Sequence, residues 1–111
     1  MKIFHSMALR DRTPEQIDSD RTAHHAWIKE NYPDGEILTT FINETPPHVK
    51  EVPLWYFGKG VAEYLSQADL LVVPHNWNTV RGVRCEKYIA EEYGVPVVVM
   101  PNFERTERKE L

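Results

Sequence analysis

The amino-acid sequence predicts an α/β domain in which a parallel sheet of four or five strands carries helices on both faces. Segments with strand and helix patterns alternate along the chain, in the order β-α-β-α-β-α-β. Residues 69–74 (Asp-Leu-Leu-Val-Val-Pro) form a continuous apolar run, which is typical of a buried parallel strand. The chain has 111 residues, enough for one domain and too few for two.

The first half of the pattern begins with a strand and a well-defined helix start. Residues 2–7 form the first predicted strand, which is mostly apolar at its beginning. Thr13 can cap a helix, Pro14 suits the first helical position, and Gln16 can complete a capping box. We therefore expect a helix from this point to about Asn31.

The middle of the chain holds the second strand and the helix with the clearest amphipathic pattern. A turn signal at residues 32–35 precedes the β-rich segment 36–42, which is the second predicted strand. Pro46 and Pro47 exclude regular structure throughout the next segment. Apolar residues then recur at steps of three and four, which predicts a helix over residues 53–68: Leu54, Phe57, Val61, Tyr64, Leu65 and Ala68.

The last third of the pattern completes the sheet. The apolar run 69–74 is the third strand, and the polar loop 75–81 follows it. A third helix is predicted over residues 82–93, and Gly94 is its expected C-terminal residue. Residues 97–100 (Val-Val-Val-Met) form the fourth strand. We assign residues 1–101 to the domain and residues 102–111 to a charged C-terminal tail.

Composition excludes several classes of function. The net charge of −4 disfavours binding to a nucleic-acid polymer through a basic surface. The single cysteine, Cys85, excludes an intrachain disulfide and a zinc site built from cysteines. No apolar run approaches the roughly 18 residues of a membrane helix. Because the chain opens directly as a strand, we expect no signal peptide and a cytoplasmic protein.

The most informative segment lies where the third strand leads into the third helix. Ligands of open α/β sheets bind at the carboxyl ends of the strands, which selects the loops 5–12, 43–55 and 75–86. Gly82 lies at a helix N-terminus, where backbone N–H groups favour anions. Glu86 follows about one turn later, where the helix dipole is expected to keep it ionised. Glu86 is either a carboxylate in a pocket at this edge or an ordinary surface residue.

Aromatic and basic side chains flank the same edge. Three aromatic residues can stack on a planar base, or can pack against the sheet or another subunit: Trp55, Tyr56 and Trp77. Three arginines suit phosphate recognition, although solvated surface arginine is the simpler interpretation: Arg12, Arg81 and Arg84.

The usual motifs for cofactors and metals are missing. No Gly-x-Gly-x-x-Gly follows the first strand, and the chain contains no Walker loop. His5, His48 and His75 lie in or beside the selected loops, but no His-x-x-x-His pair exists, so hydrogen-bonded or exposed histidine is the default interpretation. We expect neither a cofactor nor a bound metal ion.

Several segments together resemble the nucleoside 2-deoxyribosyltransferase-like superfamily, and more closely its small uncharacterised branch in phages and bacteria. The resemblance covers roughly residues 1–100. Its central feature is the step from Gly82 to Glu86 after a strand that begins with Ala-Asp. The segments that carry it are Lys2-Ile3-Phe4-His5-Ser6-Met7, Pro53-Leu54-Trp55-Tyr56, Ala68-Asp69-Leu70-Leu71-Val72-Val73, Trp77, Arg81-Gly82-Val83-Arg84-Cys85-Glu86 and Tyr93-Gly94-Val95-Pro96-Val97.

The resemblance implies a Rossmann-like or flavodoxin-like three-layer fold, a homo-oligomer with shared sites and a pocket for a nucleoside or nucleotide. Glu86 matches the carboxylate nucleophile of the active enzymes, which attacks the anomeric carbon and expels the base. Arg81 replaces the aspartate that active transferases usually carry before the glycine, and it suits a phosphorylated ligand. The remaining residues expected to bind substrate or assist the leaving base are Ser6, Met7, Arg12, Trp55, Tyr56, Asp69, His75, Trp77 and Gly82.

Three hypotheses for function follow. The first is an enzyme that cleaves or transfers at the N-glycosidic bond of a nucleotide-derived molecule through Glu86. The second is a non-catalytic nucleotide-binding protein, for example a phage protein that sequesters a nucleotide immune signal. The third is a structural or protein-interaction domain whose pocket is filled by its own tryptophans.

Overall fold

Two central strands, β1 and β3, organise a four-stranded sheet in which all strands are parallel. The computed structural model describes residues 1–9, 11–38 and 44–103. The strand order is β2-β1-β3-β4, so the chain first adds β2 on one side of β1 and then crosses to β3 on the other. The predicted α/β fold with a parallel sheet is therefore confirmed. The strands are β1 (Lys2–His5), β2 (Glu36–Ile37), β3 (Leu70–Val73) and β4 (Val97–Val99).

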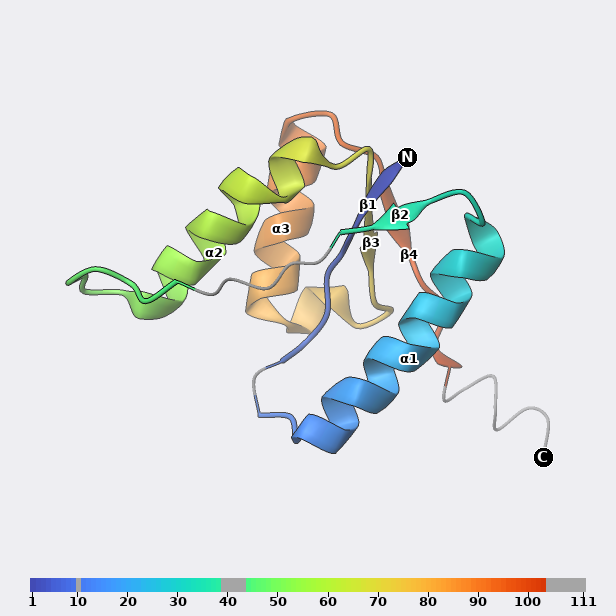
Figure 1. Cartoon of the computed structure of the whole chain (residues 1–111), viewed down its shortest axis with the longest axis horizontal. Helices are drawn as coiled ribbons and strands as arrows, with labels where there is room; N and C mark the ends of the chain where they lie inside the picture. The colour runs from blue at the N-terminus through green and yellow to red at the C-terminus, as the bar shows by residue number, and fades with distance from the viewer. Residues whose placement is uncertain (10, 39–43, 104–111) are drawn as a thin grey trace.

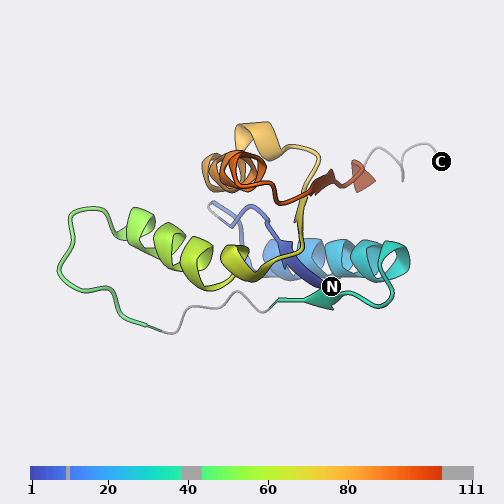
Figure 2. The same cartoon turned by 90° about the horizontal axis from the view of Figure 1, so that it is seen from above.

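Helices cover both faces of the sheet. The first helix, α1 (Pro14–Asn31), lies on one side of the strands in Figure 1, and the other two lie on the opposite side. These two are α2 (Val52–Glu63) and α3 (Arg81–Glu92). The N-terminal end of α2 lies far from the strands, as the view in Figure 2 shows. The arrangement of helix, sheet and helix is compatible with a Rossmann-like or flavodoxin-like fold.

The core consists of two apolar clusters, one on each face of the sheet. Successive side chains of a strand point to opposite faces, so neighbours in β1 and β3 enter different clusters. The cluster on the α2 and α3 side contains Phe4, Leu65, Leu71, Val73, Val83 and Ala90. The cluster on the α1 side contains Ile3, Ile28, Leu70, Val72 and Met100.

Local signals in the sequence account for the ends of two helices. The side-chain oxygen of Thr13 accepts a hydrogen bond from the Gln16 amide, and the Gln16 side chain accepts one from the Thr13 amide, which confirms the capping box. Gly94 adopts a φ of 76° just after α3, the left-handed conformation that commonly ends a helix at glycine.

The structure departs from the predicted boundaries in a few places. The strand expected over residues 2–7 ends at His5, and the fourth strand ends at Val99. Only Glu36–Ile37 of the strand expected over 36–42 is extended within the sheet, and residues 39–43 lie outside the described part of the chain. The helix expected over residues 53–68 runs from Val52 to Glu63 instead.

Short 3-10 helices occupy two of the connections. The helix η1 (Leu65–Gln67) follows α2 and brings the buried Leu65 side chain into the core. The helix η2 (Trp77–Thr79) lies within the loop that was expected to be irregular, and α3 begins at Arg81 rather than Gly82. Phe103 packs against the α1-side cluster, so this described residue of the predicted tail contacts the core; residues 104–111 are outside the described ranges.

The topology creates a site at one edge of the sheet. Because the chain leaves β1 toward β2 and leaves β3 toward β4, the loops after β1 and β3 diverge at their carboxyl ends, where open α/β sheets bind ligands. Within the described ranges, no helix combines the length and apolar character that crossing a bilayer requires.

Candidate functional site

An open groove of about 990 Å³ lies at the carboxyl ends of β1 and β3. One wall is the loop after β1, with Met7, Leu9 and Asp11 among its lining residues. The start of α2 forms a second wall through Glu51, Pro53, Leu54 and Phe57, and residues 79–83, Cys85 and Glu86 of the η2–α3 segment form a third. Residues from all three loops selected by the strand-end rule therefore line one groove.

Glu86 is the most perturbed acid in the groove. It lies in the second turn of α3 and is partly buried, and its Oε1 accepts a hydrogen bond of 2.6 Å from the Ser6 hydroxyl. Burial raises the pKa of Glu86 to about 7, because the ionised form loses hydration, while the hydrogen bond from Ser6 lowers it. An acid with a pKa near neutrality populates both its protonated and its ionised form at pH 7.

This finding corrects the expectation that the helix dipole keeps Glu86 ionised. The dipole contributes roughly 0.3–1 kcal/mol and weakens beyond the first turn, whereas Glu86 is the sixth residue of α3. Loss of hydration in the partly buried site is the larger effect, and it acts in the opposite direction.

The N-terminus of α3 presents free backbone donors to the groove. Val80 is the residue before the helix, and its side chain makes no capping hydrogen bond. The first turn contains no acidic residue, so no carboxylate of that turn offsets the positive end of the helix. Nothing lies within 4 Å of the position that a Cβ on Gly82 would take, so a ligand can approach the backbone there. This end of the groove therefore suits an anion.

Five residues predicted for the site are brought together, by contact or as lining of one groove. Met7, Arg81, Gly82 and Glu86 line it, and Ser6 reaches it through the hydrogen bond to Glu86. They come from the end of β1 and the start of α3, segments far apart in sequence, and the pairing of β1 with β3 places their ends side by side. The arrangement combines a carboxylate of raised pKa with a cationic side chain and free backbone donors.

Two predicted residues are held in other contacts. Arg12 forms an ion pair with Asp20 of α1 and is not part of the groove lining. Asp69 lies before β3, at the amino-terminal edge of the sheet, where its Oδ2 accepts a hydrogen bond of 2.8 Å from the Lys2 amide. Asp69 therefore lies at the opposite edge of the sheet from Glu86, because the length of β3 separates Asp69 from the carboxyl ends of the strands.

The predicted aromatic wall is also placed differently. Trp77 packs against the α3-side core, and the Lys87 ammonium lies 4.1 Å from its ring centroid. Trp55 and Tyr56 follow groove residues in α2 but are not among the lining; their ring centroids are 5.1 Å apart. His75 is exposed just after β3 and does not line the groove. The aromatic ring that does line the groove is Phe57.

The structure adds two carboxylates that the sequence alone did not single out. Asp11 and Glu51 both line the groove. Asp11 has a φ of 61°, which is uncommon for a residue other than glycine and better tolerated by aspartate than by most. The strand-end rule had already selected both loops, but neither position belongs to a motif, so only the folded loops reveal these side chains.

In the part of the chain that the structure describes, no group of three or more His, Cys, Asp or Glu side chains is placed so that it could hold a metal ion. Comparison of the chain with family models, curated proteins and solved structures finds no match.

The hydrogen bond between Ser6 and Glu86 makes a direct prediction about titration. Replacing Ser6 with Ala removes a donor that favours the ionised carboxylate, so the pKa of Glu86 should rise above its wild-type value of about 7. Carbon-13 NMR of the glutamate side-chain carboxyl groups measures this pKa. The matched control is Ser66→Ala, whose hydroxyl bonds the Ala62 carbonyl instead. A Glu86 pKa that is unchanged or lower in Ser6→Ala would contradict the assignment.

Proposed function

We propose that the groove binds a nucleoside- or nucleotide-derived small molecule and that Glu86 cleaves or transfers at its N-glycosidic bond. The observation that carries this proposal is the placement of Glu86: a partly buried carboxylate, held by Ser6 at 2.6 Å, beside an uncapped helix N-terminus in an open groove. When a glycosidic bond breaks, the anomeric carbon develops positive charge, and a carboxylate held beside that carbon can attack it.

The reaction would proceed by two displacements. The ionised Glu86 carboxylate attacks the anomeric carbon, the bond from that carbon to the base nitrogen breaks, and a glycosyl ester forms on Glu86. The departing base takes a proton, for which Asp11 and Glu51 are the other groove-lining carboxyl groups. Water or a second base then attacks the same carbon, releases Glu86 as a carboxylate and restores the original configuration.

The distribution of polar and apolar residues suggests how the ligand lies. Arg81 and the backbone beside Gly82 would hold a phosphate, since guanidinium groups and helix N-termini both favour phosphate oxygens. Met7, Leu54 and Phe57 would contact the base from the apolar walls. The sugar then falls between these ends, within reach of Glu86. A cytoplasmic location, which would give the groove access to the nucleotide pool of the cell, is part of this proposal.

A non-catalytic binding function is the second candidate, and the raised pKa of Glu86 is the observation that favours it. A carboxylic acid that is protonated near pH 7 can donate a hydrogen bond to a bound base or sugar without attacking it. In that case the same groove would sequester a nucleotide signal unchanged.

The first test of the proposal is Glu86→Gln, assayed for release of free base by chromatography. Nucleosides, nucleoside monophosphates and ADP-ribose derivatives serve as substrates. The wild type should release base faster as the pH rises through about 7, because only ionised Glu86 attacks. The variant should lose roughly 10³-fold or more of the rate. Intact-mass analysis should detect a glycosyl adduct only when Glu86 is present.

The control for this test is Glu92→Gln, which removes an exposed carboxylate from the same helix and should leave the rate unchanged. The melting temperature of Glu86→Gln at pH 8 should not fall below that of the wild type, since the substitution removes a partly buried charge. Equal base release by Glu86→Gln and the wild type would exclude the mechanism. Tight binding with the ligand recovered intact would establish the binding function instead.

Arg81 provides a test of the phosphate end of the groove. Arg81→Ala should weaken binding of a nucleoside monophosphate by about 1.5–3 kcal/mol, or about 10- to 150-fold, if the guanidinium makes a charge-assisted contact. The corresponding nucleoside should bind both proteins equally. Arg84→Ala is the matched control, because the Arg84 guanidinium donates to the Asn78 carbonyl and does not line the groove. Titration calorimetry measures both ligands on the wild type and on each variant, and equal losses of nucleotide affinity in the two variants would contradict the assignment.

We also propose that the protein is a homo-oligomer and that α2 contacts the second copy. No residue of α2 is buried, although the helix is largely apolar. Leu54 is 64% exposed, and Val52 and Tyr56 are exposed on the same helix. Because Leu54 also lines the groove, a subunit packed on α2 would lie beside the ligand.

Sedimentation tests this arrangement. The wild type should sediment as a dimer or a larger species at micromolar concentration, and Tyr56→Asp should shift it toward the monomer by placing a charge in the contact. Tyr93→Asp is the control, because Tyr93 is 84% exposed directly after α3 and belongs neither to α2 nor to the groove lining. A monomeric wild type, or dissociation by Tyr93→Asp alone, would contradict the proposed contact.

A further inference from the structure

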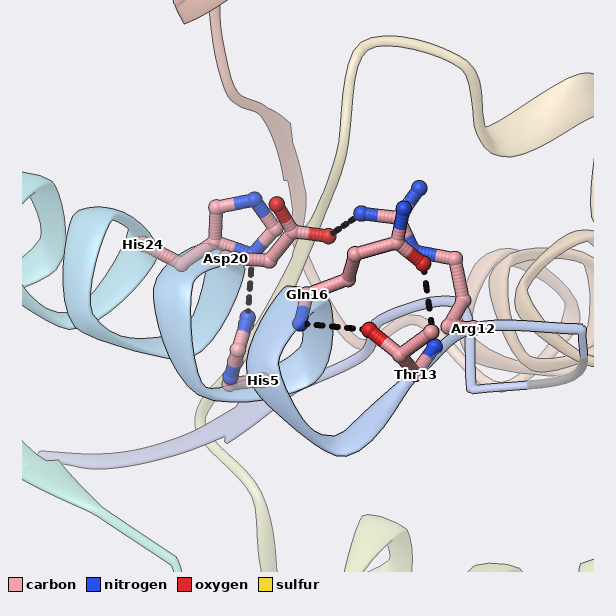
Figure 3. Close-up of polar contacts among 6 residues, drawn as sticks. All are labelled: His5, Arg12, Thr13, Gln16, Asp20 and His24. Atoms are coloured by element: carbon pink, nitrogen blue, oxygen red, sulfur yellow. Dashed lines mark hydrogen bonds and ion pairs between the residues drawn. The ribbon is translucent and has the colours of Figure 1, made fainter.

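Three histidines meet on the face of the sheet opposite to Glu86, at the junction of β1 and α1. His5 and His24 are both only 8% exposed, and their Nε2 and Nδ1 atoms are 2.8 Å apart, as Figure 3 shows. The His25 ring packs edge-on against His5, with centroids 5.1 Å apart. A hydrogen bond between two imidazoles requires one donor nitrogen and one acceptor nitrogen, so at least one of the facing nitrogens must lack a proton.

Contacts at this junction hold both ends of the loop between β1 and α1. At the end of β1, His5 is bonded to His24 of α1. At the start of α1, Thr13 is held by its capping box, and the Arg12 guanidinium pairs with Asp20. Figure 3 shows these contacts along one side of the helix, with Asp20 beside His24 and one turn before it.

This loop carries one wall of the groove. Ser6 directly follows His5 and donates to Glu86, and residues 7–9 and Asp11 line the groove. The position of the wall therefore depends on the contacts of His5 and Arg12 with α1.

We propose that the His5–His24 contact, with Asp20 as a counter-ion shared between His24 and Arg12, is an acid-sensitive clamp that holds this groove wall in place near neutral pH and releases it on acidification. The clamp needs no ligand and does not depend on the reaction proposed for Glu86. Its effect on the groove follows from the covalent connection of His5 to Ser6.

The charges around the cluster set the direction of the switch. Burial lowers the pKa of His5 to about 3, and neighbouring positive groups act in the same direction. Burial also lowers the pKa of His24, which the Asp20 carboxylate partly opposes. The titratable and charged groups that act on the three rings lie on β1, on α1, in the loop before α1 and in the loop after β3. They are His5, Arg12, Asp20, Arg21, His24, His25, Lys29 and His75.

The sign of the pH dependence follows from these directions. The closed clamp binds protons less readily than exposed histidines, whose ordinary pKa is 6.5. The closed form is therefore favoured above about pH 6.5 and loses ground as the pH falls below it, by up to tenfold in the ratio of open to closed protein per pH unit and per proton taken up. A proton on His24 attracts Asp20 and weakens its pairing with Arg12, and a second proton leaves two N–H groups facing each other.

NMR of the intact chain between pH 7.5 and pH 4.5 tests the clamp. Ring nitrogen-15 shifts report the protonation of His5 and His24, and the steady-state heteronuclear NOE of the backbone amides of residues 7–9 and 11–12 reports the mobility of the loop. At pH 6 the ring nitrogens of both histidines should remain those of neutral imidazole, because burial lowers the pKa of each ring. At lower pH, their protonation and a fall in the loop NOE should share one midpoint.

A variant separates the clamp from ordinary acid denaturation. His24→Asn places an amide near the position of Nδ1, so it retains a partner for His5 without a titrating ring, and its loop should become mobile at a lower pH than that of the wild type, by half a unit or more. His48→Asn is the matched control and should behave as the wild type. The proposal is wrong if the wild-type loop stays rigid while His5 and His24 take up protons, or if His24→Asn and the wild type share one midpoint. If His24→Asn fails to fold, the wild-type titration alone decides between these outcomes.

Discussion

The parallel pairing of β1 with β3 is the constraint on which the rest of the molecule depends. Ile3 lies opposite Leu70, Phe4 opposite Leu71 and His5 opposite Val72, and all but the histidine are apolar residues of the core. The pair is covered by helices on both faces, and β2 and β4 are each added at one side of it. Because both central strands run in the same direction, their carboxyl ends lie together and their loops diverge from one point.

The alternation of side chains along β1 gives the two faces of this point different chemistry. Ile3 and His5 face α1, whereas Phe4 enters the core beneath α3 and Ser6 donates to Glu86 of that helix. Two consecutive residues thus connect the end of one strand to a buried histidine pair on one side and to a partly buried acid on the other. Because one peptide bond joins His5 and Ser6, we expect a movement of the strand end that alters one contact to act on the other.

Burial produces the unusual ionisation on both sides, with opposite signs. On the groove side, loss of hydration raises the pKa of Glu86 to about 7, and on the α1 side it lowers the pKa of His5 to about 3. In both cases burial disfavours the charged form, so His5 is uncharged at neutral pH and Glu86 is present in both its protonated and its ionised form, near the positive end of α3.

Local patterns in the sequence determined the elements of this fold. The apolar run of β3, the capping box of Thr13 and Gln16, and the glycine after α3 each depend on neighbours within a few residues, and each appears in the structure as expected. The strand-end rule also selected the loops that line the groove, because parallel topology alone decides which loops share an edge. Gly82 and Glu86 could also be recognised from the sequence, because both lie within one predicted helix and their separation is a local pattern.

Tertiary packing decided what those patterns leave open. Which way Trp77 turns depends on the core of distant residues that it joins, and whether Arg12 faces a ligand depends on Asp20, eight residues away on α1. The ionisation of Glu86 and the contact between His5 and His24 depend on burial between segments that only the fold brings together. The spacing of residues in the sequence determines which face of one helix or strand each side chain takes. Burial and long-range contacts depend on several elements at once, and it is burial and these contacts that decide the chemistry of the site.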